Sequence, residues 1–293
     1  MEVLEHCTLC PRSCGVNRLA GERGFCRAGA LPKVARAFLH KWEEPCLSGT
    51  RGSGTVFFSH CNMRCIYCQN YRISWQGRGR EITVADLNGI FLDLQASGAH
   101  NINLVSPTPY IPVIIPALIE AKEEGLNIPV VYNSNAYETV AALRSLEGLV
   151  DIYLPDLKYI DAATAGRYSH APDYFSAATA AILEMYRQVG TLTFDEGGMA
   201  RRGLLIRHLL LPGQVKAACR ILDWIRDNLP RETYVSLMAQ YVPVWQAGRC
   251  PEINRPITAA EYEAFLDYFE ALGLENGYCQ GLEASTTAYI PEF

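Results

Sequence analysis

The sequence predicts an α/β fold: a laterally open (β/α)6 partial TIM barrel with a small N-terminal cysteine-rich module that binds metal. Six short runs are rich in Val, Ile, Leu or Tyr and almost continuously apolar, as parallel strands buried on both faces are. Segments with helical spacing of apolar residues separate these runs, which indicates right-handed crossovers. Six units are fewer than the eight of a closed barrel, so we expect an open one. The expected strands are residues 55–59, 101–105, 129–133, 151–154, 203–211 and 234–238.

Four segments carry the pattern of helices that face the core. Thr83 and Asp86 form the start signal of the first, and Thr258 and Glu261 form that of the last. The apolar residues of the other two recur at helical spacing. These two helices are expected near residues 175–189 and 215–225.

Composition bounds the domain count and the partners. The chain has 293 residues, 49% of them hydrophobic, which suits one barrel-sized domain and a small appendage. We expect the module in residues 1–50 and the barrel in residues 51–293. The net charge is −5 and no block is rich in Lys or Arg, so we expect no nucleic-acid partner.

The sequence also predicts a cytoplasmic protein without a membrane partner. The N-terminus lacks the basic and apolar regions of a signal peptide. The most apolar segment, residues 110–121, is too short to cross a bilayer and contains Pro112 and Pro116. Eight of the 11 cysteines come before residue 70 in tight clusters, which suits metal ligation in a reducing cytosol better than disulfides.

Four cysteines near the N-terminus predict a closed metal site. Cys7, Cys10, Cys14 and Cys26 have the spacing Cys-x2-Cys-x3-Cys-x11-Cys in a glycine- and charge-rich segment with few large apolar residues. Such a short segment rarely folds without a metal, a disulfide or a partner surface. Four thiolates can hold either a 4Fe-4S cluster or zinc, and the spacing leaves both open. Cys46 is a substitute ligand or a buried thiol.

A second cysteine loop follows the first expected strand. Cys61, Cys65 and Cys68 have the spacing Cys-x3-Cys-x2-Cys at the carboxyl end of that strand, where α/β folds place their chemistry. A 4Fe-4S cluster takes four thiolates and a closed zinc site takes four ligands, whereas this loop supplies three. One iron would then be free to bind a substrate or cofactor.

These motifs resemble the radical S-adenosylmethionine superfamily, and within it the group similar to pyruvate formate-lyase activating enzymes. The likeness rests on Cys-x2-Cys-Pro-Arg-x-Cys-Gly-Val-x-Arg, Glu-Glu-Pro-Cys-x-Ser-Gly, Gly-Ser-Gly-Thr-Val-Phe-Phe-Ser-x-Cys, Cys-Gln-Asn-Tyr and Ser-Pro-Thr-Pro, and it spans nearly the whole chain. His60 stands where that group has glycine. The resemblance implies that the open iron chelates S-adenosylmethionine, whose reductive cleavage gives a 5'-deoxyadenosyl radical that abstracts hydrogen.

The resemblance also implies a cofactor site at the strand ends. The aromatic residue before the third cysteine is Tyr67, and the amino group of the cofactor would meet Ser106 or Thr108 after the second strand. Asp156 and Lys158 match the family's Asp-Leu-Lys segment. Further expected contacts come from the ends of the third, fifth and sixth strands: Asn133, Ser134, Arg207 and Gln240. Asn133 replaces an acid of the family pattern, which removes one ligand of a monovalent cation.

Several functions remain open from the sequence. The implied partners are S-adenosylmethionine, an electron donor such as flavodoxin or ferredoxin, and a glycyl-radical protein that the chain would activate. Radical modification of a small molecule or peptide is the alternative. A non-catalytic iron–sulfur electron carrier or redox sensor would need a fourth protein ligand, for which His60 and Cys46 are candidates. Cys250 and Cys279 are either substrate-facing or inert.

Overall fold

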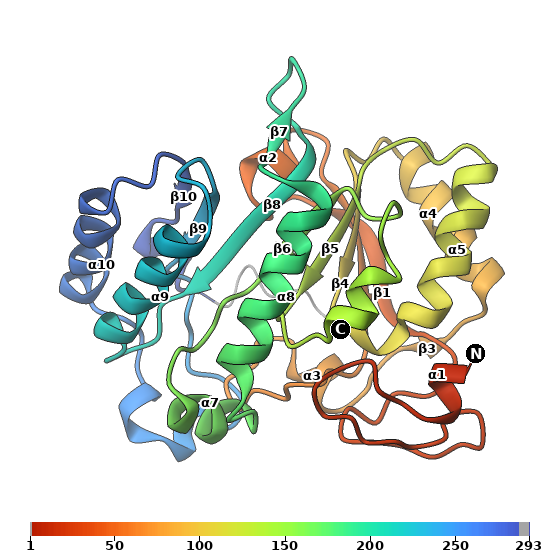
Figure 1. The fold of residues 1–293 in the computed structure, drawn as a ribbon, viewed down its shortest axis with the longest axis horizontal. Helices are drawn as coiled ribbons and strands as arrows, with labels where there is room; N and C mark the ends of the chain where they lie inside the picture. The colour runs from red at the N-terminus through yellow and green to blue at the C-terminus, as the bar shows by residue number, and fades with distance from the viewer. Residues whose placement is uncertain (1, 287–292) are drawn as a thin grey trace.

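One open sheet organises the computed structural model, which describes residues 2–286 and residue 293 (Figure 1). All six expected strands are present and lie side by side in chain order as parallel strands. They are β2 (Ser53–Phe58), β4 (Ile102–Val105), β5 (Val130–Ser134), β6 (Ile152–Pro155), β8 (Ala200–Leu209) and β9 (Tyr234–Met238). The short β10 (Gly277–Cys279) extends the sheet in parallel beyond β9. The edges of the sheet do not meet, so the partial barrel stays open.

Three further strands are antiparallel to their neighbours. β1 (Lys33–His40) pairs with β2, β3 (Arg80–Glu81) pairs with β1, and β7 (Thr193–Phe194) pairs with β8. The sequence analysis did not predict β1, because only Val34 of its eight residues is buried and no continuous apolar run marks it. The sheet therefore begins at Lys33, within residues 1–50, which we expected to form the N-terminal module.

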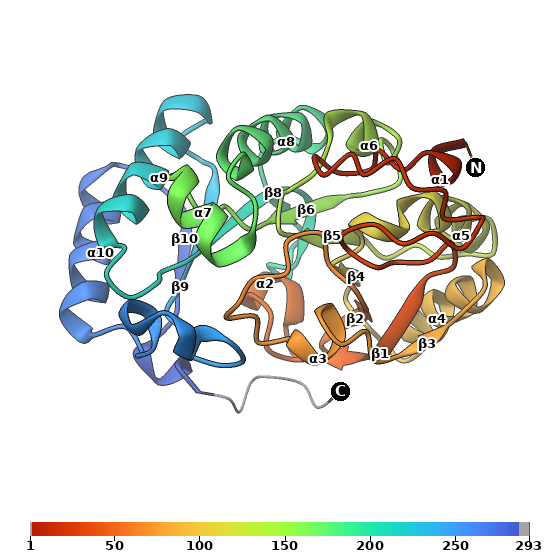
Figure 2. The same cartoon turned by 90° about the horizontal axis from the view of Figure 1, so that it is seen from below.

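Helices cover the outer face of the sheet (Figures 1 and 2). The longer ones are α4 (Val84–Ala96), α5 (Ile111–Glu123), α7 (Ala162–Ser169), α8 (Tyr174–Val189), α9 (Val215–Asn228) and α10 (Ala259–Ala271). The shorter ones are α1 (Glu2–Glu5), α2 (Pro45–Ser48), α3 (Tyr71–Ser74) and α6 (Val140–Arg144). Both capping boxes exist as the sequence predicts, at Thr83 with Asp86 and at Thr258 with Glu261.

The helix α2 closes the amino-terminal end of the barrel. Asn101, which comes just before β4, donates a 2.8 Å hydrogen bond from its side chain to the carbonyl of Leu47 in α2. Cys46 and Leu47 are buried in a cluster with Val131 and Ile152. Cys46 is thus a core thiol at the opposite end of the strands from the cysteine loop, with α2 at the upper end and α3 at the lower end in Figure 1.

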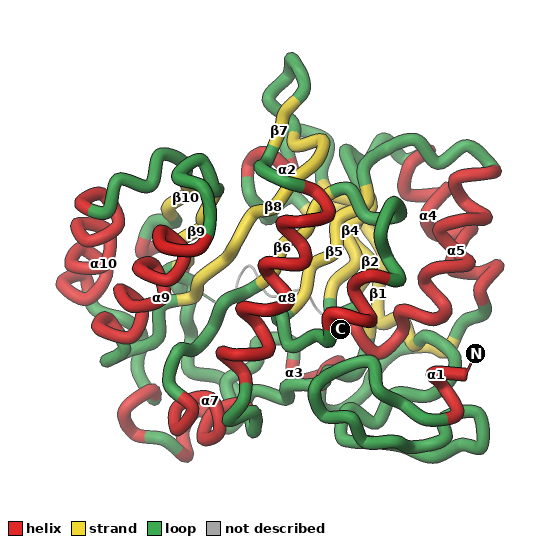
Figure 3. The backbone as a smooth tube through the Cα atoms, viewed as in Figure 1, coloured by secondary structure: helices red, strands yellow, loops and turns green. Residues whose placement is uncertain are grey.

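The N-terminal segment is built mainly of loops. Residues 6–32 form turns and irregular backbone that lie below the carboxyl ends of the strands (Figure 3). No helix among the described residues is long and apolar enough to cross a bilayer. All 11 cysteines carry free thiols, so no disulfide holds this segment.

Candidate radical SAM site

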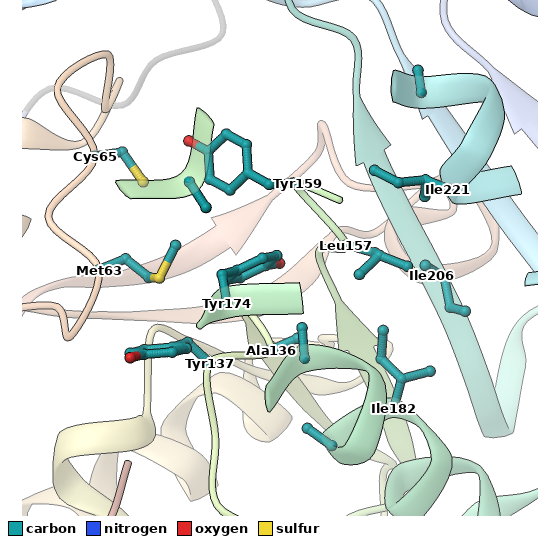
Figure 4. Close-up of a cluster of buried hydrophobic side chains, with 14 of the residues drawn as sticks. Met63, Cys65, Ala136, Tyr137, Leu157, Tyr159, Tyr174, Ile182, Ile206 and Ile221 are labelled. Carbon is teal, nitrogen blue, oxygen red and sulfur yellow. The ribbon is translucent and has the colours of Figure 1, made fainter. Parts of the chain in front are cut away.

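The cysteine loop joins β2 to α3 and packs over the buried core. His60 and Arg64 adopt left-handed backbone conformations, with φ of 72° and 54°, which turn the chain back at the first cysteine and before the second. The Trp75 indole donates a 3.0 Å hydrogen bond to the carbonyl of Cys65 and so ties the loop to the end of α3. Figure 4 shows Cys65 beside Met63 on one side of an aromatic cluster that contains Tyr159.

Each of the three sulfurs in the loop has a polar neighbour outside the cysteines. The Cys61 sulfur accepts a 3.4 Å hydrogen bond from the Asn135 amide, and the Cys65 sulfur accepts one of 2.9 Å from the Ser169 hydroxyl. The Cys68 sulfur and the Ser74 hydroxyl are 3.2 Å apart. Such contacts orient ligating thiolates and tune the reduction potential of a metal centre.

The loop carries three thiols, which are the type of ligand that an iron–sulfur cluster takes. Burial raises the pKa of Cys65, and it raises the pKa of Cys68 to about 12. Both thiols are therefore protonated until a metal centre displaces the protons. Among the described residues, no three His, Cys, Asp or Glu side chains converge as ligands of one metal ion would. A 4Fe-4S cluster takes a different arrangement, because each thiolate binds a different iron.

The four N-terminal cysteines meet at a separate small cavity. Cys7, Cys10, Cys14 and Cys26 all line it, and burial raises the pKa of Cys10 to about 12. Gly24 lies against this cavity, since an added Cβ would be 2.4 Å from the Cys14 sulfur. The four residues that the sequence grouped as one site thus line one cavity, although no three of them converge as the ligands of one metal ion would.

Arg12 connects the N-terminal segment to the cysteine loop. Its guanidinium donates hydrogen bonds to the carbonyl of Asn62 at 3.0 Å, to that of Ser169 at 3.2 Å and to that of His170. It also lies over the ring of Phe25 at 3.9 Å. Arg12 thereby fixes the loop between the first two ligands and the serine that contacts Cys65.

A cavity of about 430 Å³ lies inside the barrel, within the usual size range of ligand pockets. The sulfurs of the loop lie on its wall, as do polar residues from the ends of the strands. The expected site residues that line it are Cys61, Cys65, Cys68, Tyr67, Ser106, Asn133, Ser134, Asp156, Lys158, Arg207 and Gln240. The strand register explains this, since Val105 pairs with Asn133, and Ser134 with Pro155, at the same edge.

A network of charged side chains lies in this cavity. The Lys158 ammonium is 2.7 Å from Asp156, and the Arg207 guanidinium is 3.0 Å from the same carboxylate. Arg207 also donates to the Asn133 side chain at 2.6 Å and to Glu43 at 3.3 Å. Burial opposes ionisation of Asp156, but Lys158 and Arg207 outweigh it and hold its pKa below the usual value.

One expected cofactor contact lies elsewhere. Thr108 does not line the large cavity, because it begins a short 3-10 helix (Thr108–Tyr110) that turns its side chain into the core. Its hydroxyl donates a 2.6 Å hydrogen bond to Glu138, a carboxyl that is also buried. Of the two candidates after the second expected strand, the structure therefore places only Ser106 at the cavity.

Three ligand-type side chains in the cavity were not assigned to the site from the sequence. Glu43 and Glu44 enter it from the loop before α2, and His40 comes from the end of β1. Cys279, which the sequence left as substrate-facing or inert, lines the cavity from the end of β10, and Cys250 does not line it. The adjacent pair of acids was visible in the sequence, but only the position of α2 at the closed end of the barrel shows that they face inward. Neither Cys46 nor His60 lines the cavity.

The open parallel sheet and the cysteine loop at its carboxyl edge define an α/β protein with a candidate metal site of three thiols. The sequence profile of the Radical SAM superfamily matches residues 55–224, which run from β2 through β8 into α9 and include the three-cysteine loop. The chain belongs to the radical SAM superfamily, and this membership implies a 4Fe-4S cluster and S-adenosylmethionine.

Comparison with individual proteins gives further likenesses. "Uncharacterized protein MJ0674" of Methanocaldococcus jannaschii is 32% identical over 283 residues, covering 93% of this chain and 77% of that protein. Two crystal structures of SuiB from Streptococcus suis, one bound to the precursor peptide SuiA, each give a TM-score of 0.50 at 14% and 15% identity. The matches cover 75% and 78% of this chain, which spans about half the SuiB length, 46% and 48%. At this identity the likeness to SuiB concerns the fold.

Proposed function

We propose that this chain is an enzyme that cleaves S-adenosylmethionine reductively at a 4Fe-4S cluster bound by Cys61, Cys65 and Cys68. The observation that supports this function is the convergence of the three cysteines on the cavity that also holds Lys158. Neither candidate for a fourth ligand, His60 or Cys46, lines that cavity. When bound, the cluster supplies the electron that cleaves the sulfonium to methionine and a 5'-deoxyadenosyl radical for hydrogen abstraction.

The charged residues of the cavity bind and orient the cofactor in this proposal. Lys158 uses one N–H for Asp156 and has others for the carboxylate of the cofactor. Asp156 positions Lys158 and keeps it charged, because it opposes the effect of burial and raises the lysine pKa. Arg207 already has three protein acceptors, so we assign the carboxylate to Lys158 and a supporting role to Arg207.

Neutral groups complete the proposed cofactor site. Hydrogen bonds to the amino group and the ribose would come from Ser106, Asn133, Ser134 and Gln240. Tyr67 is buried with its hydroxyl on that of Tyr159, and it supports the loop from below. Asn135 and Ser169 donate to the ligating sulfurs and stabilise them as thiolates.

The N-terminal cavity would hold a second metal centre in this proposal. Cys7, Cys10, Cys14 and Cys26 would fill all four positions of a 4Fe-4S cluster or a zinc ion, and residues 1–50 would include this module. The lack of regular structure in residues 6–32 supports the proposal, because such a segment needs cross-links of some kind. Electron transfer and stabilisation of the fold are the roles open to it.

The distribution of charge supports an acidic electron donor. Residues 6–32 and 60–80, which lie at the carboxyl ends of the strands, contain eight Arg and a single acid, Glu22, although the whole chain has a net charge of −5. Both cysteine sites lie within these residues, so an acidic protein such as flavodoxin or ferredoxin would be attracted to the end of the molecule that needs electrons.

The substrate is either a glycyl-radical protein or another peptide or small molecule. The open barrel edge gives a protein segment access to the cavity, as activation of a glycyl-radical enzyme would require. The fold is similar to that of SuiB, which has been crystallised with a precursor peptide, and this favours a peptide as the second candidate.

The test is anaerobic reconstitution of the chain, followed by iron analysis and product assay. About eight irons per chain would indicate two clusters and about four would indicate one. We expect an electron paramagnetic resonance shift on adding S-adenosylmethionine and release of 5'-deoxyadenosine under dithionite. Cys65→Ala should abolish release and lower iron, whereas Cys279→Ala should retain the iron content of the unmodified chain. Clusters that give neither shift nor release would make the chain a carrier or sensor and refute the proposal.

A further inference from the structure

The closed end of the cavity carries two adjacent carboxylates with different surroundings. Both oxygens of Glu43 have partners, since Asn103 donates to one at 3.1 Å and Arg207 lies 3.3 Å from the other. Glu44 is only 8% exposed and lines the same cavity. One of its oxygens, Oε2, has no hydrogen-bond partner among the described residues. A buried carboxylate oxygen without a partner costs free energy unless a ligand supplies one.

The charges of the cavity do not balance at this end. Arg207 and Lys158 are the cations that line it, and they are paired with Glu43 and Asp156. Glu44 is the third carboxyl group of this lining and has no ion pair of its own within 4.0 Å among the described residues; burial raises its pKa, and the attraction of Arg207 and a hydrogen bond with Ser236 oppose that effect. The complement of such a buried carboxyl group is a cation that also donates hydrogen bonds, which describes an ammonium or a guanidinium group.

The walls suit the carbon chain that would carry such a cation. Leu209 and Met238 line the cavity, and Tyr278 lies near Glu44. An alkyl chain can lie along these side chains while its charged head reaches Glu44. The cysteine loop is at the other end of the cavity, so carbons of the same chain would lie toward the reacting end of the site.

We propose that Glu44 binds a primary ammonium or guanidinium group of the substrate at the closed end of the barrel. This inference rests on the proposed function, because it identifies the substrate class of the same site. The group belongs either to a lysine or arginine side chain of a peptide or to a free alkylamine. Glu43 and Arg207 form the closed end of the site, and Glu44 contacts the positively charged group of the substrate.

The experiment is calorimetric titration of the reconstituted chain with three probes: agmatine, acetyl-Gly-Lys-Gly-amide and acetyl-Gly-norleucine-Gly-amide. We expect at least one charged probe to bind with a Kd below about 1 mM and the norleucine peptide to bind at least about tenfold more weakly. Stronger binding of agmatine would identify a free amine, and stronger binding of the lysine peptide would identify a peptide. Equal binding of the charged and uncharged peptides, without agmatine binding, would overturn the proposal.

Variants test the role of the residue itself. Glu44→Gln should weaken the charged probe at least about tenfold, whereas Glu263→Gln, an exposed carboxylate on α10, should not change its affinity. The comparison of charged and uncharged probes uses the unmodified chain, so it tests the proposal even if the Glu44→Gln variant folds poorly. Unchanged affinity in a folded Glu44→Gln, or no binding by the unmodified chain up to about 10 mM, would contradict the inference.

The proposed function is tested separately in the same samples. Release of 5'-deoxyadenosine under dithionite without any probe reports on radical chemistry alone. Normal release without amine binding would overturn the assignment of Glu44 and leave the radical function. Amine binding without release of 5'-deoxyadenosine would refute the radical function and leave the assignment of Glu44.

Discussion

Arg207 should be one of the most important residues for the stability of the barrel. Its guanidinium contacts Asp156 at 3.0 Å, Asn133 at 2.6 Å and Glu43 at 3.3 Å, and only 14% of its side chain is exposed. Arg207→Met removes all three contacts and leaves two buried carboxylates without this cation. Breaking a buried ion pair on one side costs about 3–5 kcal/mol. We therefore expect the free energy of unfolding to fall by that amount, measured by urea unfolding with tryptophan fluorescence.

The pH dependence and a control separate this prediction from a general loss of packing. Arg207 and Lys158 keep the pKa of Asp156 below its usual value in spite of burial, so this stability is present at neutral pH and lost as pH falls. The deficit of Arg207→Met should thus hold down to about pH 4 and shrink below it. Arg220→Met, which breaks an exposed pair with Asp161, should cost less than about 1 kcal/mol. A deficit for Arg207→Met that is equally small, or that does not change with pH, would refute the reasoning.

Three more predictions concern the surroundings of the two cysteine sites. Burial raises the pKa of Glu138 to about 7, so the free energy of unfolding should fall by about 3 kcal/mol from about pH 4.5 to pH 7. Glu138→Gln should remove this pH dependence in urea unfolding at several pH values, and an unchanged pH dependence would contradict this. Gly24→Ala places a carbon 2.4 Å from the Cys14 sulfur, so metal analysis should show loss of the N-terminal metal alone, and full metal content would show that the sulfur moves aside. Ser169→Ala removes a hydrogen bond to the Cys65 sulfur and should lower the reduction potential of the cluster by about 60 mV or more in a redox titration; an equal or higher potential would contradict it.

The sequence predicted the parallel part of the sheet because its signal is local. Six apolar runs gave six parallel strands in chain order, and Thr83 and Thr258 cap their helices as the capping-box pattern indicates. β1 escaped prediction because its partly exposed position at the edge of the sheet requires no apolar run. Strand existence could therefore be predicted where burial on both faces dictates composition, and not at the antiparallel edge.

The candidate site was partly predictable for a related reason. Side chains that directly follow a parallel strand, such as Ser106 and Asp156, reach the cavity because parallel strands share one carboxyl edge. Thr108 is three residues beyond its strand, and its short helix turns it away. Glu43 and Glu44 precede a helix of four residues at the opposite end, and no local pattern could place them inside the barrel.

Arg12 has a consequence for how the protein must be prepared. Because this one side chain anchors the N-terminal segment on the carbonyls of Asn62, Ser169 and His170, damage by air at the outer site would also loosen the inner one. Molecules that have lost the proposed N-terminal metal should therefore hold the inner cluster less firmly and lose it sooner in air than intact ones. These half-loaded molecules should also be the more sensitive to proteolysis.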